Sequence, residues 1–285
     1  MNGSSEQRPR TVLITGASKG IGRACALRMH ARGWRVFAGV RSGADAEDLR
    51  AGTSDLLVPV RLDVTDAGDI AGAVRIIGEH ASGSLDAVVN NAGISIAAPL
   101  EFLPLDELRR QFDVNVFGAI AVTQAVMPML RKANGRIVFI SSISGRSSTP
   151  YTGAYAGSKH AIEALADALR VELMPWRMPV SLVEPGVIRT PIWETSIAHA
   201  ERMLGDAPPQ LDSLYGDRLA GVRRLVSQPR GLPPETVADA VEHALTARRP
   251  RSRYVVGNDA RLRLLVEMLP TRIRDAIIDW KVNRL

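Results

Sequence analysis

Seven short β-type runs alternate with longer helical stretches along this chain of 285 residues. Several of these runs, notably 12–14 and 137–140, are apolar at consecutive positions, which is typical of strands buried on both faces. Such alternation favours right-handed βαβ units and therefore a parallel sheet with helices on both faces. The runs are 11–15, 34–40, 57–62, 85–90, 136–141, 180–184 and 254–256. We predict a single-domain α/β fold with a doubly wound, seven-stranded parallel sheet.

The composition agrees with one large core, because 46% of the residues are apolar and 23% are charged. We expect a flexible tail over 1–10 and a main domain over 11–260 that includes a loosely patterned insertion at 188–234. Two amphipathic, basic helices over 261–285 complete the chain. One cysteine, a polar first segment and the lack of an 18-residue apolar stretch predict a cytoplasmic protein.

The charge is unevenly distributed. The net charge is +6, and residues 246–285 carry ten Arg or Lys against four Asp or Glu. In the last helix Ile273, Ile277 and Trp280 form one stripe, with Arg272, Arg274, Lys281 and Arg284 around it. Such a helix suits contact with an anionic membrane surface, or docking on the protein or on a partner subunit. Nucleic-acid binding is not expected, because aromatic interleaving and a docking motif are lacking.

A glycine-rich turn, T-G-A-S-K-G-I-G at 15–22, follows the first run and leads into a helical stretch. Glycines let a backbone turn tightly and approach a pyrophosphate, which the amide N–H groups and the helix N-terminus then bind. We predict a dinucleotide site here, and the alternative is a glycine-rich turn without a ligand. The candidate residues are Gly16, Ser18, Lys19, Gly20, Ile21 and Gly22.

The spacing T-G-x-x-x-G-x-G resembles that of the short-chain dehydrogenase/reductase family, and the order of motifs extends the resemblance over 11–254. The run N-N-A-G at 90–93 resembles the family element beside the cofactor, and L-D-V at 62–64 resembles the adenine contact. The resemblance implies a Rossmann-type fold and adds Asp63, Val64, Asn91, Ala92 and Gly93 to the cofactor-binding set. On the residues alone, the two asparagines only cap and turn the chain.

The end of the second run favours NADP(H). An acidic residue there would bind the ribose 2′-hydroxyl and repel a 2′-phosphate. Val40 stands where NAD-preferring relatives carry Asp, while Arg41 and Lys19 supply the two positive charges of NADP-preferring relatives. If Arg41 is simply exposed, NAD(H) fits instead.

Tyr155 and Lys159 lie four residues apart in a helical stretch and therefore share one face. Reduction of a ketone needs a proton donor, and a nearby ammonium lowers the pKa of a phenol toward the working range. The alternative is that these two residues are simply an exposed pair on the surface of a helix. Ser142, which precedes Tyr155 by the family's thirteen residues, is predicted to orient the substrate oxygen; Ser141 and Tyr151 are the competing hydroxyls.

The resemblance also implies roles for later residues. Asn115 matches the helix asparagine that supports a proton relay, although a mid-helix Asn can simply bond its own helix. Pro185, Gly186, Ile188 and Thr190 resemble the segment beneath the nicotinamide, so Tyr155, Lys159 and these four belong to the cofactor set. Stretches 105–130 and 153–173 correspond to the family's dimer helices, which implies a homodimer or homotetramer. The histidines form no metal pattern.

The insertion is rich in large apolar side chains, which suit a hydrophobic ligand or pack a lid helix onto the protein. These are Ile192, Trp193, Ile197, Met203, Leu204, Leu211, Leu214, Tyr215 and Leu219. We therefore expect an NADP(H)-dependent oxidoreductase that acts on a secondary alcohol or ketone with a hydrophobic skeleton, such as a steroid, a retinoid-like or a long-chain compound. A dinucleotide-sensing regulator without chemistry is the alternative.

Overall fold

The computed structural model describes residues 8–205, 208, 210–226 and 231–282, with the backbone alone for 222–226. Seven parallel strands form one sheet in the order β3-β2-β1-β4-β5-β6-β7. The strands are β1 (Thr11–Ile14), β2 (Arg35–Val40), β3 (Leu57–Arg61), β4 (Ala87–Asn90), β5 (Arg136–Ile140), β6 (Val180–Pro185) and β7 (Arg253–Val256). The predicted fold class is confirmed. Most of the tail expected at 1–10 lies outside the described residues.

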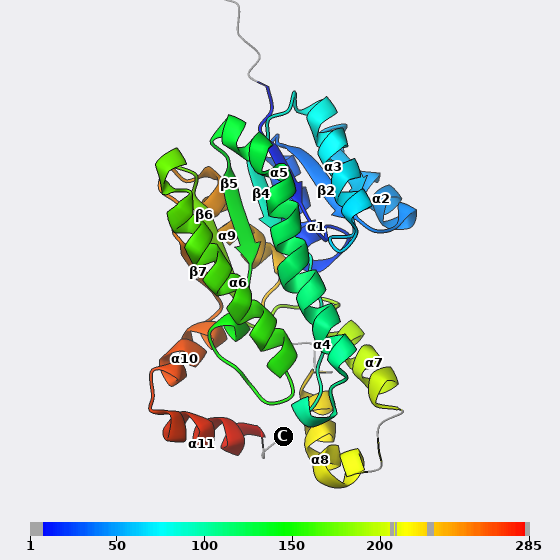
Figure 1. Cartoon of the computed structure of the whole chain (residues 1–285), viewed down its shortest axis with the longest axis vertical. Helices are drawn as coiled ribbons and strands as arrows, with labels where there is room; N and C mark the ends of the chain where they lie inside the picture. Colours follow the sequence, from blue (N-terminus) through cyan, green and yellow to red (C-terminus); the bar gives the residue numbers. More distant parts are fainter. Residues whose placement is uncertain (1–7, 206–207, 209, 227–230, 283–285) are drawn as a thin grey trace, which may run out of the picture.

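Both faces of the sheet are buried, which explains the runs of consecutive apolar residues. In β1, Val12 and Ile14 pack toward one layer of helices and Leu13 toward the other. The first layer contains α1 (Gly20–Ala31) and α9 (Pro234–Thr246), which pack against each other. The second layer contains α3 (Ala67–His80), α5 (Ala119–Ala133) and α6 (Gly153–Glu172), seen in front of the sheet in Figure 1. Helix α2 (Gly43–Arg50) lies near the β3 edge.

The remaining helices gather near the carboxyl ends of the strands, at the lower end of the molecule in Figure 1. They are α4 (Leu105–Phe112), α7 (Ile192–Leu204), α8 (Gln210–Val226), α10 (Asn258–Glu267) and α11 (Thr271–Val282). The insertion is therefore mainly helical, and an isolated bridge between Ile188 and Leu232 joins its two ends. Helices α8 and α11 are in contact. Segments distant in sequence thus meet below the edge of the sheet where parallel strands place a ligand site.

Among the described residues, one stretch, Leu105–Ala133, is long and apolar enough by length and composition to cross a membrane. From the sequence we expected no apolar stretch of 18 residues. The most apolar window of Leu105–Ala133 is 44% buried inside the protein. Val122, Val126 and Leu130 pack in the core beside the sheet, so packing accounts for the apolar character of these positions.

Candidate active site

A cleft of about 930 Å³ opens at the carboxyl ends of the strands, within the size range of small-ligand sites. Of the predicted site residues, eighteen line it. They are Gly16, Ser18, Lys19, Gly20, Ile21, Arg41, Asp63, Val64, Asn91, Ala92, Gly93, Ser142, Tyr155, Lys159, Pro185, Gly186, Ile188 and Thr190. Gly22 and Asn115 do not line it. The structure thus gathers residues from six strand ends into one space.

The glycine turn is shaped for a close approach of its backbone. Gly16 and Gly20 adopt φ angles of +63° and +53°, which favour glycine. At Gly22 a Cβ would lie 2.2 Å from the Gly16 carbonyl oxygen and 2.5 Å from Asn91 Nδ2. Asn91 Nδ2 donates to the carbonyl oxygens of Thr15 and Gly16, at 2.9 and 3.0 Å. Gly22 therefore makes room for the contact between the turn and the end of β4.

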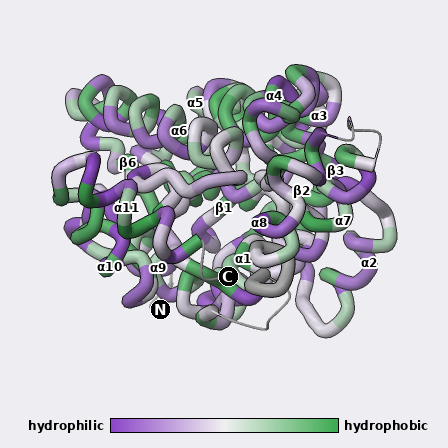
Figure 2. The backbone as a smooth tube through the Cα atoms, turned by 90° about the horizontal axis from the view of Figure 1, so that it is seen from below, coloured by the Kyte–Doolittle hydropathy of each residue, from purple (hydrophilic) through white to green (hydrophobic). Residues whose placement is uncertain are grey.

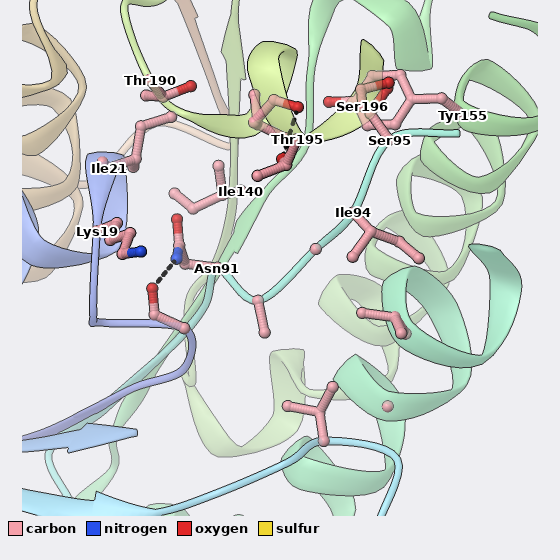
Figure 3. A pocket seen from close by; sticks show the side chains of 18 of the residues that line it. Lys19, Ile21, Asn91, Ile94, Ser95, Ile140, Tyr155, Thr190, Thr195 and Ser196 are labelled. Atoms are coloured by element: carbon pink, nitrogen blue, oxygen red, sulfur yellow. Dashed lines mark hydrogen bonds between the residues drawn. The ribbon is translucent and has the colours of Figure 1, made fainter. Parts of the chain in front are cut away.

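The start of α1 is suited to an anion. Lys19 is the N-cap residue, its side chain makes no capping hydrogen bond, and the first turn contains no acidic residue. The N-terminal N–H groups of a helix lack partners within the helix and attract negative charge. Figure 3 shows Lys19, Ile21 and Asn91 on one side of the pocket and Tyr155 on the other. The pyrophosphate of a dinucleotide fits this cradle, in which any side chain at Gly22 would collide.

The end of the cleft beside β2 and β3 carries opposite charges at its rim. Lys19 and Arg41 both line it. Asp63 Oδ1 accepts hydrogen bonds from the Thr65 N–H and Oγ1, at 3.0 and 2.7 Å. Burial acts to raise the pKa of Asp63, but the bonds from Thr65 and the charges of Arg41 and Arg61 outweigh it, so this pKa lies below its usual value. Asp63 is therefore ionised and ordered at neutral pH.

Ser142, Tyr155 and Lys159 come together at the other end of the cleft. Ser142 follows β5, and its Oγ accepts a hydrogen bond from the Ser144 N–H at 3.1 Å. Lys159 is only 5% exposed and its Nζ donates to the Ile140 carbonyl oxygen at 2.8 Å. The Nζ atom lies 5.7 Å from the centre of the Tyr155 ring. The helix face predicted from the four-residue spacing is therefore present and faces the cleft.

The pKa of Tyr155 differs from the expectation. Burial raises the pKa above its ordinary value, and a hydrogen bond with Ser142 and the charge of Arg263 lower it only in part. Burial also lowers the pKa of Lys159 itself, to about 8. In the protein alone, the phenol is thus a proton donor rather than a base.

Arg263 does not line the cleft but its charge acts on the site, and the sequence did not single it out. It lies on α10, its Nη2 donates to the Ser147 carbonyl oxygen at 2.9 Å, and its charge reaches the Tyr155 phenol. Burial lowers the pKa of its guanidinium. In the sequence Arg263 was one of ten basic residues in the last forty, and no local pattern distinguishes it.

Asn115 supports the cleft from behind. It lies in a π-helical segment, Asp113–Gly118, between α4 and α5, and is 2% exposed. Its Oδ1 accepts from the Ile94 N–H at 2.9 Å, and its Nδ2 donates to the Ile94 carbonyl oxygen and to Ser158 Oγ, both at 3.0 Å. The alternative that Asn115 bonds its own helix is wrong, because the helix widens there and directs the amide toward the non-strand segment after β4.

The two competing hydroxyls, those of Ser141 and Tyr151, lie in different environments. Ser141 also lines the cleft, but its Oγ is buried and has no hydrogen-bond partner. Tyr151 is not among the lining residues; its ring packs edge-on against Tyr215, with the centroids 6.2 Å apart. Packing is thus the role that the structure supports for Tyr151.

The insertion contributes a more polar wall than its sequence indicated. Of its nine large apolar side chains, only Ile192 and Trp193 line the cleft. Helix α7 adds the polar lining residues Thr195, Ser196, His199 and Arg202, and Ser95 adds a buried hydroxyl without a partner. The other apolar groups either pack, as Leu211 does, or are exposed, as Leu214 is. No group of three or more potential metal ligands occurs in the described part of the chain.

Comparisons with known proteins agree with this geometry. A family model described as short chain dehydrogenase matches residues 10–201. Retinol dehydrogenase 5 of Mus musculus is 37% identical over 96% of this chain and 89% of its own length. An NADPH-dependent 3-dehydrocapnine reductase of Ornithobacterium rhinotracheale is 34% identical over 97% of this chain and 98% of its own. A short-chain dehydrogenase from Streptomyces avermitilis has a similar structure, with a TM-score of 0.78, 31% identity and coverage of 97% and 98%.

Proposed function

Because the chain belongs to the short-chain dehydrogenase family, we propose that it is an NADP(H)-dependent oxidoreductase that interconverts a secondary alcohol and a ketone. The observation that carries the proposal is the meeting of Ser142, Tyr155 and Lys159 in one cleft with the glycine turn. When bound, the nicotinamide supplies or accepts the hydride. The protein's own residues bind and orient the cofactor and the substrate, and they move the proton.

The phenol of Tyr155 donates the proton to the oxygen that becomes the alcohol. Its raised pKa keeps it protonated at neutral pH, as a donor requires. The Ser142 hydroxyl, which interacts with the same phenol, holds the substrate oxygen in reach. Lys159 holds the nicotinamide ribose, and Asn115 orders the backbone of Ile94 and supports the path of the proton to solvent.

The cofactor preference rests on two cations. Lys19 and Arg41 line the cleft where a 2′-phosphate would lie, and the matching position in β2 is the neutral Val40. The name of the Ornithobacterium relative, an NADPH-dependent reductase, supports the same choice. NAD(H) is the second cofactor in our proposal, to be compared directly in binding assays.

The substrate that we propose has a hydrophobic skeleton and a polar end. Ile192 and Trp193 offer apolar surface, and the name of the mouse relative, a retinol dehydrogenase, points to a similar ligand class. Ser95 and Ser196 lie near Tyr155 in Figure 3 and offer hydroxyls to a second polar group. A panel of retinoid-like, steroid and long-chain carbonyl compounds tests this; turnover of sugars in their place would contradict it.

The decisive test of the activity is Tyr155→Phe. The variant keeps the ring and loses the proton donor, so we expect NADPH oxidation with a substrate ketone to fall by about 10²- to 10⁴-fold. NADPH binding, measured by fluorescence, should change little. Equal rates in the variant and the wild type would contradict the enzyme and favour the regulator without chemistry.

We also propose two contacts at the surface. The helices α4 to α6 form a homodimer or homotetramer interface, as the family resemblance implies, which sedimentation can test. On helix α11, Ile273 and Ile277 are exposed beside Arg272, and both α10 and α11 mix hydrophobic and hydrophilic residues (Figure 2). We propose that the protein is cytoplasmic and that α11 contacts an anionic membrane surface. Co-sedimentation with anionic liposomes, with and without residues 271–285, tests this; no difference assigns α11 to the protein or a partner subunit.

A further inference from the structure

A buried carboxylate follows Lys159 by one helical turn. Glu163 is one helical turn further along α6, and both side chains are only 5% exposed. The only hydrogen bond that the structure shows for the Lys159 Nζ goes to the Ile140 carbonyl oxygen. An ammonium at this depth loses most of its hydration, and burial alone favours the neutral amine. The Glu163 charge acts in the opposite direction and raises the pKa of Lys159.

Glu163 is held in place from the edge of the sheet. Arg253, at the start of β7, donates from Nε and Nη2 to Glu163 Oε2, at 3.2 and 3.1 Å. The other oxygen, Oε1, is buried and has no hydrogen-bond partner among the residues that the structure describes. At Gly145 a Cβ would lie 3.0 Å from Glu163 Cγ and 3.1 Å from the Lys159 carbonyl oxygen, so the segment after β5 closes over this face.

Other charges surround the carboxylate. Arg253 also contacts Asp167 Oδ2 at 2.6 Å and Glu184 Oε1 at 3.0 Å, and Arg146 lies 3.6 Å from that same Glu184 oxygen. Asp167 pairs with Arg170 as well. Burial and the charge of Glu163 raise the pKa of Glu184. Of these acidic groups, Glu163 is the one whose charge raises the pKa of Lys159.

We propose that Glu163, fixed by Arg253, is a positioning residue that keeps the buried Lys159 ammonium charged and thereby sets the upper pH limit of the reaction. The statement about the reaction rests on the proposed function, whereas the statement about Lys159 does not. A carboxylate near an ammonium stabilises its charged form, and one oxygen of Glu163 is not used by Arg253. The network therefore links β7 to the catalytic face of α6.

The chain offers a direct test, because it contains only four lysines, Lys19, Lys132, Lys159 and Lys281. Incorporation of ¹³Cε-lysine followed by an NMR titration of the whole protein reports the midpoint of each one. Lys159 is assigned by the resonance that disappears in Lys159→Arg. We expect a wild-type midpoint at about 8. In Glu163→Gln it should fall by about 1 pH unit, the lower end of the effect of an opposite charge at close range.

Two controls separate charge from structure. Glu172→Gln removes an exposed carboxylate from the same helix, and Glu184→Gln removes a buried partner of the same arginine. Both should leave the Lys159 midpoint in place. If Glu163→Gln does not fold, Glu163→Asp replaces it as the test. The aspartate side chain is one carbon shorter, so we expect the Lys159 midpoint to fall in the same direction by a smaller amount. An unmoved midpoint in the Glu163 variants, or an equal fall in Glu184→Gln, would overturn the proposal.

The pH profile of turnover is the second measurement. The alkaline limb of kcat should move to lower pH in Glu163→Gln by the same amount as the NMR midpoint, while NADPH binding at pH 6 should be unchanged. A loss of activity at all pH values without a shift of the limb would show a merely structural role. If the wild type has no dehydrogenase activity but the Lys159 midpoint still shifts, the proposed function fails and the assignment of Glu163 stands.

Discussion

Replacement of Gly22 by alanine should disrupt the packing of the glycine turn against Asn91 at the end of β4. The added Cβ would lie 2.2 Å from the Gly16 carbonyl oxygen and 2.5 Å from Asn91 Nδ2. Both contacts are far shorter than van der Waals distance, and the first is with backbone. Asn91 therefore has to move, and its two hydrogen bonds to Thr15 and Gly16 are lost or lengthened.

The magnitude follows from these contacts. Two hydrogen bonds at about 0.5–1.5 kcal/mol each amount to roughly 1–3 kcal/mol of unfolding free energy. Overpacking adds about 1–3 kcal/mol, and the better helix propensity of alanine in α1 returns about 1 kcal/mol. We expect a net loss of roughly 1–5 kcal/mol, which corresponds to a fall in Tm on the order of 10 °C for a chain of this size.

The assay is denaturant unfolding followed by circular dichroism, together with fluorescence titration of NADPH. Gly72→Ala is the matched control, because Gly72 also lies inside a helix and a Cβ added there would meet nothing within 4 Å. That variant should be neutral or gain up to about 1 kcal/mol. NADPH affinity should fall only in Gly22→Ala. Unchanged stability and affinity in Gly22→Ala would refute the close approach of the turn to Asn91.

Three further predictions concern two charged residues of the site and the hydrogen bonds of Asn115 behind it. Arg263→Met should raise the pKa of Tyr155, since the guanidinium lowers it, and so move the acidic limb of kcat/KM for alcohol oxidation to higher pH, whereas the exposed Arg261→Met should not. Arg41→Ala should weaken NADPH binding by roughly 10- to 100-fold, as for the loss of a charged hydrogen bond, and leave NADH binding nearly unchanged; equal losses would contradict the assignment. Asn115→Leu should lower the unfolding free energy by about 1–3 kcal/mol in denaturant melts, because the Ile94 N–H loses its partner while the Ile94 carbonyl keeps only the bond from Gln111 Nε2; a stability equal to the wild type would contradict this role.

Much of the sheet could be predicted because its signal is local. Each observed strand begins and ends within two residues of the limits that we predicted for it. The run expected at 85–90, for example, forms a strand that begins at Ala87. The turn at 15–22 was found from its spacing, and the pair Tyr155 and Lys159 from its spacing together with the family resemblance; the structure places them in one cleft. Strand, turn and helix geometry depend on neighbouring residues, so a short window of sequence is sufficient.

The insertion and the charges of the site were less predictable. Nine apolar side chains indicated an apolar wall, yet only Ile192 and Trp193 line the cleft, since helix faces are chosen by the packing of the whole domain. The pKa of Tyr155 also depends on burial and on Arg263, neither of which the four-residue spacing to Lys159 reveals. Local patterns identify chemical groups, but their electrostatic surroundings come from segments far along the chain.

The amino-acid sequence by itself determined the order of strands and helices along the chain, the glycine-rich turn and the shared helix face of Tyr155 and Lys159, because each depends on residues a few positions apart. The tertiary structure alone decided that Arg253 reaches Glu163 across 90 residues of chain and that the charge of Arg263 on α10 acts on the Tyr155 phenol. The physical reason is that the strength of a charge depends on its burial and its neighbours in space. Both are set only when the sheet and its two helical layers pack together.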